Sequence, residues 1–304
     1  MRFRRLIVTA LLAVIAFVSK GTAQSRAECG SVPSRILKHP VPYCALLPPS
    51  FDRSAPKPGQ EEKARRFPIL YYLHGRGDNE QSLINSGAWS LIEDLRRQAK
   101  IGEFVIVTPA GGSSFYVNSS NGKVRYSDFF LQEFMPFIER KYRIEASRSA
   151  RGIDGMSMGG YGALHFGFAH PELFGSVSAH SAALLPEPST ELNAAIRAGE
   201  PQAMMLASVF GNPIDPDNWE HNNPFALATK NAAALRKLHI YFDCGDHDDF
   251  GFDRGATALD ALLTRKKVQH EFHLYPGGHD IGYFLAHIAA SIEFHSHSFG
   301  APSS

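Results

Sequence analysis

A serine with closely spaced glycines on both sides is the strongest chemical signal in the chain. The stretch "GIDGMSMGGYGAL", residues 152–164, contains five glycines, and Gly155, Ser157 and Gly159 fit the pattern G-x-S-x-G. Each glycine in a helix interior costs about 1 kcal/mol relative to alanine, so this number needs a local reason. A sharp strand-to-helix turn supplies one, because it exposes a serine and has no room for neighbouring Cβ atoms. The motif therefore predicts a nucleophile at Ser157.

A serine hydroxyl attacks a carbonyl only when a base removes its proton. "LYPGGHD" places His279 in the loop after the last predicted strand, where a base can project over the end of the sheet. The other histidines of this region lie in or beside that strand, or on the closing helix: His270, His273, His287, His295 and His297. We therefore predict that His279 is the base.

The acid that orients the base is expected in the preceding strand-to-helix loop, "DCGDHDDFGFD". This loop offers Asp246, Asp248, Asp249 and Asp253, whereas Asp243 lies within the strand and reaches less far. Because a shift of one residue only re-aims the side chain, the residues alone leave these four carboxylates open. The loop also lacks the regular spacing and terminal Glu of an EF-hand calcium site.

Acyl transfer also needs hydrogen-bond donors for the negative oxygen that develops in the transition state. One predicted donor is the backbone N–H of Met158, directly after the nucleophile. The second is expected in the loop after the strand "ILYYLHG", with Arg76 as first choice and Gly77 next. His74 is expected to order this loop. "HGRGDN" lacks the third glycine of a phosphate-binding loop, so that interpretation is discarded.

Strands alternating with helices must position these groups. Continuous apolar runs at 67–75, 103–110 and 174–181 are typical of buried parallel strands, and helical patterns follow them along the chain. The pattern predicts one α/β domain with a mostly parallel sheet, interrupted by an insertion at 182–229 over one end of the sheet. Aromatic residues that could form walls of a cleft there are Trp219, Phe210, Phe225 and, beyond the Arg76 loop, Trp89.

The overall charge excludes one class of partner. The chain has 304 residues, with 31 Lys and Arg against 30 Asp and Glu, a formal net charge of +1. No basic stripe stands out, so we expect no nucleic-acid partner.

The first 23 residues have the three parts of a secretory leader. "MRFRR" is cationic, the 13 residues from Leu6 to Val18 are uncharged, and small residues follow at Gly21 and Ala23. Thirteen residues are fewer than the roughly 20 that span a bilayer. The pattern predicts cleavage near Ala23, a single domain over 24–304, and a secreted or periplasmic protein without membrane attachment.

Three cysteines remain after the leader. In an oxidising compartment Cys29 and Cys44 could form a disulfide, but spacing alone does not assign partners. Cys244 lies in an apolar run and is expected to be a buried thiol.

Four motifs, in order, resemble the putative-esterase family of α/β-hydrolases: "LYYLHGRGDNEQSL", "GMSMGGYGAL", "FDCGDHDDF" and "YPGGHDIGYF". That family includes esterase D (the S-formylglutathione hydrolases), microbial feruloyl esterases and mycobacterial mycolyltransferases. The resemblance implies an α/β-hydrolase fold and a serine esterase that needs no metal or cofactor. It also implies that Asp248, the third residue after the glycine of "CGDHD", is the acid.

The resemblance leaves the substrate open. Export favours an extracellular ester, such as an acylated or feruloylated carbohydrate, over an S-formylglutathione-type thioester. Acyl transfer of the mycolyltransferase type differs only in the final acceptor. A non-catalytic binding module on the same fold is a further alternative, and the intact set of serine, acid and histidine counts against it.

Overall fold

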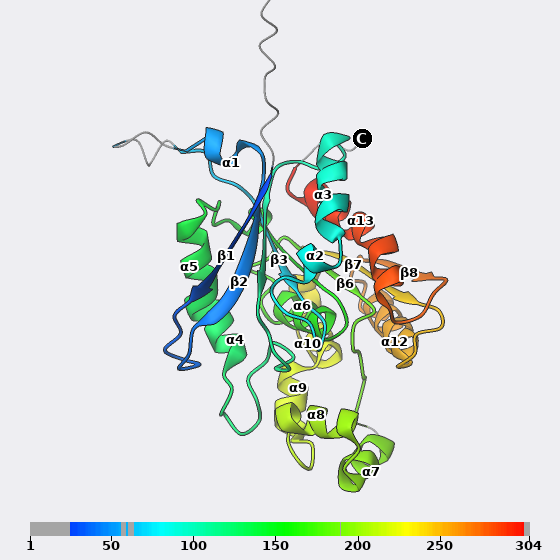
Figure 1. Ribbon diagram of the computed structural model, residues 1–304. Helices are drawn as coiled ribbons and strands as arrows, with labels where there is room; N and C mark the ends of the chain where they lie inside the picture. The colour runs from blue at the N-terminus through cyan, green and yellow to red at the C-terminus, as the bar shows by residue number, and fades with distance from the viewer. Residues whose placement is uncertain (1–24, 56–58, 60–63, 189, 301–304) are drawn as a thin grey trace, which may run out of the picture.

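A twisted eight-stranded sheet organises the molecule (Figure 1). The computed structural model describes residues 25–55, 59, 64–188 and 190–300, so the predicted leader at 1–23 lies outside the described residues. Along the sheet the strands run β1 (Arg26–Val32), β2 (Val41–Leu47), β4 (Val105–Pro109), β3 (Ile69–Leu73), β5 (Arg151–Gly155), β6 (Ser176–His180), β7 (His239–Gly245) and β8 (Glu271–Tyr275). Strand β2 runs antiparallel to both of its neighbours, β1 and β4, and the other five pairs are parallel, which confirms the predicted mostly parallel sheet.

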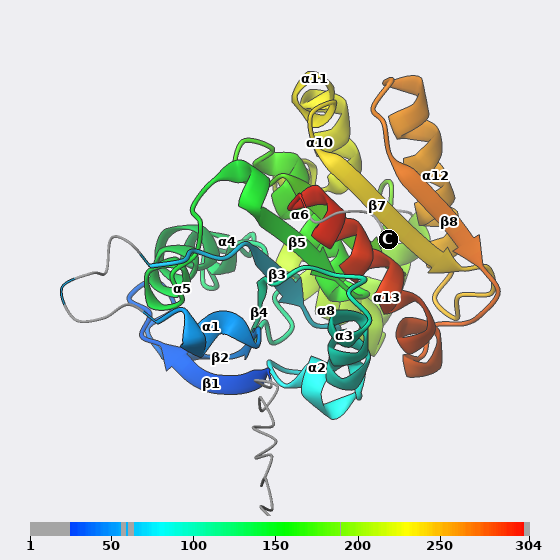
Figure 2. The same ribbon diagram turned by 90° about the horizontal axis from the view of Figure 1, so that it is seen from above.

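Helices cover both faces of this sheet, because its central strands are apolar on both sides. In β3, Ile69, Tyr71 and Leu73 enter one core cluster, whereas Leu70 and Tyr72 enter the other. The second cluster is covered by α2 (Ser82–Asn85), α3 (Ala88–Arg97) and α13 (Ile281–Ser298), which lie together in the view of Figure 2. The first is covered by α4 (Tyr126–Phe129), the π-helical η2 (Phe130–Phe134), α5 (Met135–Lys141), α6 (Met158–Ala169), α10 (Pro224–Lys230) and α12 (Phe252–Arg265).

The predicted insertion at 182–229 is helical and lies beyond the sheet. It holds α7 (Thr190–Ala198), α8 (Pro201–Phe210), α9 (Pro216–Asn222) and most of α10. Asp215 and Asn223 cap α9 and α10 by accepting backbone N–H bonds, and a proline follows each cap, a sequence that starts a helix sharply. Figure 1 shows α7 and α8 below the strands.

The short helices α1 (Ser50–Arg53), α11 (Ala232–Leu235) and η3 (Arg148–Ala150) connect the larger elements. Within the described ranges, no helix is both long enough and apolar enough to cross a bilayer.

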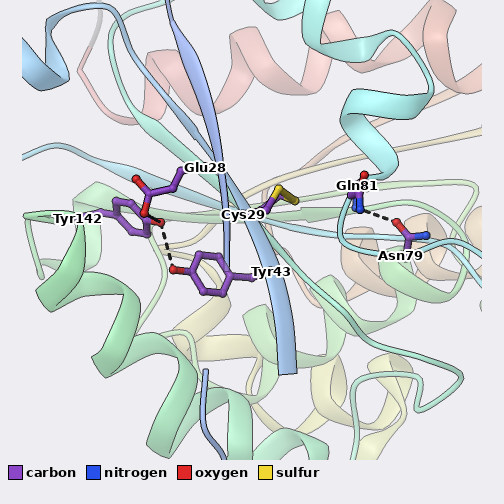
Figure 3. Close-up of a disulfide and its surroundings, with 7 residues drawn as sticks. Glu28, Cys29, Tyr43, Asn79, Gln81 and Tyr142 are labelled. Atoms are coloured by element: carbon purple, nitrogen blue, oxygen red, sulfur yellow. Dashed lines mark hydrogen bonds between the residues drawn. A yellow bond between two sulfur atoms is a disulfide. The ribbon is translucent and has the colours of Figure 1, made fainter. Parts of the chain in front are cut away.

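A disulfide fastens the N-terminal edge of the sheet. Cys29 of β1 and Cys44 of β2 are direct cross-strand partners and form the bond whose pairing the sequence left open (Figure 3). Next to it, Glu28 accepts hydrogen bonds from Tyr142 Oη at 3.0 Å and from Lys141 Nζ at 2.6 Å. Strand β1 is therefore bound covalently to β2 and electrostatically to the end of α5.

Candidate active site

Ser157 occupies the turn between β5 and α6. Its backbone has φ +55° and ψ −116°, a conformation that costs energy for any residue with a Cβ atom. The Ser157 N–H donates to the carbonyl oxygen of His180 at 2.9 Å, so β6 holds the turn in place. This is the strand-to-helix geometry that presents a serine side chain above a parallel sheet.

The glycines on either side of Ser157 are required by close backbone contacts. A Cβ atom on Gly155 would collide with the carbonyl group of Gly159. A Cβ atom on Gly159 would collide with the carbonyl oxygen of Leu73, on β3. The turn can therefore pack against β3 only with glycine at both positions, which explains the spacing seen in the sequence.

His279 joins the serine to a carboxylate. The Ser157 hydroxyl lies 2.9 Å from His279 Nε2, and His279 Nδ1 lies 2.6 Å from Asp248 Oδ2. The three residues come from the ends of three different parallel strands, β5, β7 and β8. The structure thus brings together the predicted nucleophile, the predicted base and one of the four candidate acids.

Asp248 is held in its ionised form. Its other oxygen, Oδ1, accepts the backbone N–H groups of Phe250 and Phe252 at 2.9 and 3.3 Å. Burial opposes the negative charge, but the hydrogen bonds from His279 and from these two N–H groups outweigh it and lower the pKa of Asp248. An ionised Asp248 can keep the Nδ1 proton on His279 and leave Nε2 free to accept from the serine.

The neighbouring carboxylates have other contacts. Asp246 binds His247 Nδ1 and the Gly277 N–H, and Asp249 accepts the backbone N–H of His279 rather than its ring. Asp253 lies in the first turn of α12. Asp243 is buried in the core, as its place within the strand suggested. Among the four candidates, Asp248 is the one whose carboxylate contacts the His279 ring.

The predicted oxyanion donors lie at the same site. Arg76 and Met158 line one cavity with Ser157. Within the described part of the chain, neither of their backbone N–H groups donates to a protein acceptor. Gly77, the second choice on this loop, has φ +83° and lies outside the lining of that cavity.

Buried His74 fixes the loop that carries Arg76. Its Nε2 accepts the Gly111 N–H at 2.8 Å, so its Nδ1 carries the proton and donates to the Gly75 carbonyl at 2.7 Å. Because the C=O and N–H of a trans peptide point in opposite directions, this bond turns the Arg76 N–H away from His74. Burial lowers the pKa of His74, which favours this neutral form.

The cavity beside Ser157 has a volume of about 280 Å³ and mainly apolar walls. Helices α7 and α8 supply much of the wall, and the remainder comes from loops after the parallel strands. Its apolar lining residues are Phe115, Met158, Ala183, Leu185, Leu192, Ala195, Ala203, Met205, Leu206, Phe250 and Phe252. Phe250 and Phe252 also contact the His279 ring edge to face, at centroid distances of 4.8 and 5.4 Å.

The predicted aromatic walls are wrong in their details. Trp219 is 6% exposed and packs against Phe210 in the core, with ring centroids 5.0 Å apart. Trp89 lies on α3 and packs against the core cluster beneath that helix, whereas Phe225 packs against the core cluster on the other face of the sheet. Neither residue lines the cavity. The aromatic residues at the cavity are Phe115, Phe250 and Phe252 instead, and the last two lie two and four residues after the acid in sequence.

A second serine–histidine group is closed to any substrate. His295 lies between Ser176 and Ser178, with each ring nitrogen 2.7 Å from one hydroxyl. All three residues are fully buried, and burial lowers the pKa of His295 to about 4. This group therefore packs the core and has no access to an ester.

Known proteins are similar to this chain in sequence and in fold. Residues 34–295 match the family described as "Putative esterase". An acetyl esterase of Caldicellulosiruptor saccharolyticus is 26% identical over 266 residues, which are 86% of this chain and 95% of that protein. An esterase of Mycobacterium tuberculosis is 27% identical over 71% of this chain, and the match spans only 49% of that protein's length.

The structural comparison agrees with the family match. A solved structure of a ferulic acid esterase superimposes with a TM-score of 0.75 and 27% identity, covering 91% of this chain and 99% of that one. The shared fold is the α/β-hydrolase fold that the sequence motifs implied. The chain belongs to the putative esterase family.

Proposed function

We propose that this protein is a secreted serine carboxylesterase in which Ser157 is the nucleophile, His279 the general base and Asp248 the orienting acid. One observation carries this proposal: the unbroken hydrogen-bonded chain from Asp248 through His279 to Ser157, at the mouth of an apolar cavity. The unpaired N–H groups of Met158 and Arg76 on that cavity add the donors that the chemistry needs.

Acylation begins when His279 Nε2 takes the proton of Ser157 Oγ as the oxygen bonds to the ester carbonyl carbon. The carbonyl oxygen becomes negative and accepts hydrogen bonds from the Met158 and Arg76 N–H groups. The imidazolium then gives its proton to the alcohol oxygen, the C–O bond breaks, and the alcohol leaves. The acyl group remains on Ser157 as an ester.

Deacylation repeats these steps with water. His279 takes a proton from a water molecule whose oxygen bonds to the acyl carbon, and Ser157 leaves with the proton that His279 returns. Asp248 stays ionised throughout and stabilises the transient imidazolium, as its lowered pKa favours. No step calls on a metal or another cofactor.

The cavity supports an apolar or aromatic acyl group as the part of the substrate that it holds. Its walls are mostly aliphatic and phenylalanine side chains, with Arg76 and Glu200 among the polar ones, and removing an apolar group from water against them lowers the free energy. One related protein is named an acetyl esterase and another a ferulic acid esterase, so their names refer to a small acyl group and an aromatic one. We propose acyl or feruloyl esters of carbohydrates as the natural substrate class.

The proposed secretion rests on two observations. The leader pattern at residues 1–23 is of the cleaved type, and the Cys29–Cys44 disulfide persists most readily in an oxidising compartment. N-terminal sequencing of the exported protein should give a start near Gln24. A protein retained inside the cell with its first residues intact would contradict the proposal.

Hydrolysis of p-nitrophenyl acetate through decanoate tests the proposed activity. The wild-type protein should release p-nitrophenol, and Ser157→Ala should remove this activity. Ser149→Ala is the matched control, because this exposed serine lies before β5, at the opposite end of the sheet from Ser157. A wild-type protein inactive on every ester, or an active Ser157→Ala variant, would overturn the proposal.

The same assay with added sugars distinguishes an esterase from an acyltransferase. A shift of the product from the free acid to a sugar ester would indicate an acyltransferase.

A further inference from the structure

Below the active site the core contains a cluster of ionised and hydroxyl side chains that the proposed mechanism does not use. At its centre is Asp243 of β7, which is 1% exposed. Its carboxylate accepts from His180 Nδ1 at 2.8 Å, from Tyr241 Oη at 3.0 Å and from Tyr283 Oη at 2.8 Å. These donors come from β6, from β7 itself and from α13.

His180 extends the cluster to a second carboxylate. Its Nε2 lies 2.8 Å from Ser291 Oγ, on α13, and Ser291 Oγ in turn donates to Asp154 Oδ2 at 2.9 Å. The other oxygen of Asp154 accepts the Gly155 N–H at 2.7 Å and lies 3.8 Å from His180 Nε2. Asp154, His180 and Ser291 are all fully buried.

The cluster holds buried charge. Burial opposes protonation of His180, but Asp243 and Asp154 outweigh it and raise the pKa of His180 to about 9. At neutral pH the His180 ring therefore favours its charged form, between Asp243 and Asp154. Replacing such buried ionic groups by apolar ones is often neutral or stabilising, so their presence is weak evidence for a role in stability and better evidence for one in geometry.

The cluster connects every segment that carries a member of the Ser157–His279–Asp248 chain. Asp154 lies three residues before Ser157, and the His180 carbonyl accepts the Ser157 N–H. Asp243 lies five residues before Asp248 on the strand that leads to it, and Tyr283 lies four residues after His279.

We propose that Asp243 is a positioning residue. Through its hydrogen bond with Tyr283 it holds the segment that carries His279 in the correct position relative to Ser157. This proposal rests on the proposed function.

Two tyrosines allow a matched test of this role. Both donate to the Asp243 carboxylate, and both are largely buried. Tyr241 is two residues from Asp243 on the same strand, so its bond to this carboxylate lies within β7, and its hydroxyl also interacts with Tyr275 of β8. The Tyr283 bond instead links β7 to the segment that carries His279. Tyr283→Phe and Tyr241→Phe therefore remove the same group from the same carboxylate, but only the first removes the hydrogen bond from α13, the helix that directly follows His279 and Asp280.

The expected result is a split between kcat and stability. Both variants should unfold at similarly reduced denaturant concentrations. Tyr283→Phe should lower kcat for a p-nitrophenyl ester on the order of ten- to a hundred-fold with KM unchanged, because a misplacement near 1 Å can cost that much. Tyr241→Phe should keep kcat within about two-fold, since the Tyr283 bond that joins α13 to Asp243 remains. Equal kcat values in the two variants, whether both normal or both reduced, would overturn the proposal.

A second pair covers the case in which Tyr283→Phe does not fold. Ser291 and Ser296 are both fully buried on α13, but Ser291 contacts His180 and Asp154, whereas Ser296 accepts the Gly102 N–H. Ser291→Ala should lower kcat and Ser296→Ala should not; the reverse order or equal effects would refute the link. An inactive wild-type protein would refute the proposed function itself, so the two failures are distinguishable.

Discussion

The side chain of Asp248 differs from those of its neighbours in what it contacts, and this difference predicts their mutational effects. Asp248→Asn should lower kcat by about 10⁴, because an asparagine favours the wrong tautomer of His279 and cannot stabilise the imidazolium. Asp246→Asn is the matched control on the same loop and should retain near-normal turnover, since Asp246 contacts His247 and Gly277 instead. Ester hydrolysis under saturating substrate measures both. A large loss in Asp246→Asn or Asp249→Asn, with Asp248→Asn still active, would reassign the acid.

Single residues were predictable from the sequence to the extent that local pattern constrains them. Ser157 is marked by glycines that backbone contacts require, and His279 by its place after the last strand. The choice of Asp248 needed the family resemblance, because adjacent loop carboxylates differ only in direction. Trp219 was misplaced because its burial depends on how α9 packs against Phe210 of α8, a tertiary contact without a local signal.

At the scale of elements, α7 should control which acyl groups enter the cavity. Ala195 lines the cavity, whereas its neighbour Ala194 is exposed on the same helix. Ala195→Phe should therefore lower kcat/KM for p-nitrophenyl decanoate about ten-fold or more relative to the acetate, since a filled pocket rejects longer chains. Ala194→Phe should leave the chain-length profile unchanged. If Ala195→Phe lowers kcat/KM equally for all the esters, the part of the substrate that binds beside α7 is the leaving group and not the acyl group.

The disulfide is an element-scale constraint on β1 and β2. Cys29 and Cys44 are 15 residues apart, and closing a loop of that size stabilises a fold by about 3 kcal/mol in the chain-entropy model. The double variant Cys29→Ser/Cys44→Ser should lose about this free energy of unfolding in guanidinium titrations. Its kcat at 25 °C should stay normal, because β1 and β2 lie at the sheet edge, away from β5. A variant as stable as the wild-type protein would show that β1 is held by its other contacts alone.

The elements were predicted best where apolar runs were long. Strands β3, β4 and β6 fall within the predicted apolar runs, with ends trimmed by one or two residues. Strand β1 was not predicted, because most of its side chains are exposed and its pairing with β2 decides its conformation. The helical insertion was predicted in place, but its packing over Ser157 depends on contacts far apart in the chain.

At the scale of the whole molecule, the order of the strands in the sheet could not be predicted. Alternation of strands and helices predicts that the strands are parallel, but not which strand lies beside which. The same holds for the buried histidines, whose surroundings come from several elements. His165 is 3% exposed and donates from Nδ1 to the Asn222 carbonyl, and burial lowers its pKa to about 3. Burial lowers the pKa of His295 to about 4 and that of His74 in the same direction.

These neutral histidines predict a loss of stability on mild acidification. An unfolded histidine has a pKa near 6.5, so below that pH each of the three takes up a proton on unfolding. Stability is then fully present above about pH 6.5 and falls as the pH drops toward 4, by up to about 1.4 kcal/mol per pH unit for each histidine. His180, with its pKa raised to about 9, is protonated in the folded state throughout, whereas an unfolded histidine is only half protonated at about pH 6.5. It therefore offsets part of this slope near pH 6.5 and adds almost none below about pH 5.5.

Urea unfolding at intervals between pH 5 and 6.5 measures this slope, above the range in which most unfolded carboxylates titrate. His295→Gln should reduce the slope by about one proton, because the buried imidazole between Ser176 and Ser178 is then absent in both states. His297→Gln, an exposed position two residues further along α13, should retain the wild-type slope. A wild-type protein whose stability is constant over this range would mean that the core accepts these protons, through water or through rearrangement of the hydroxyls around each ring.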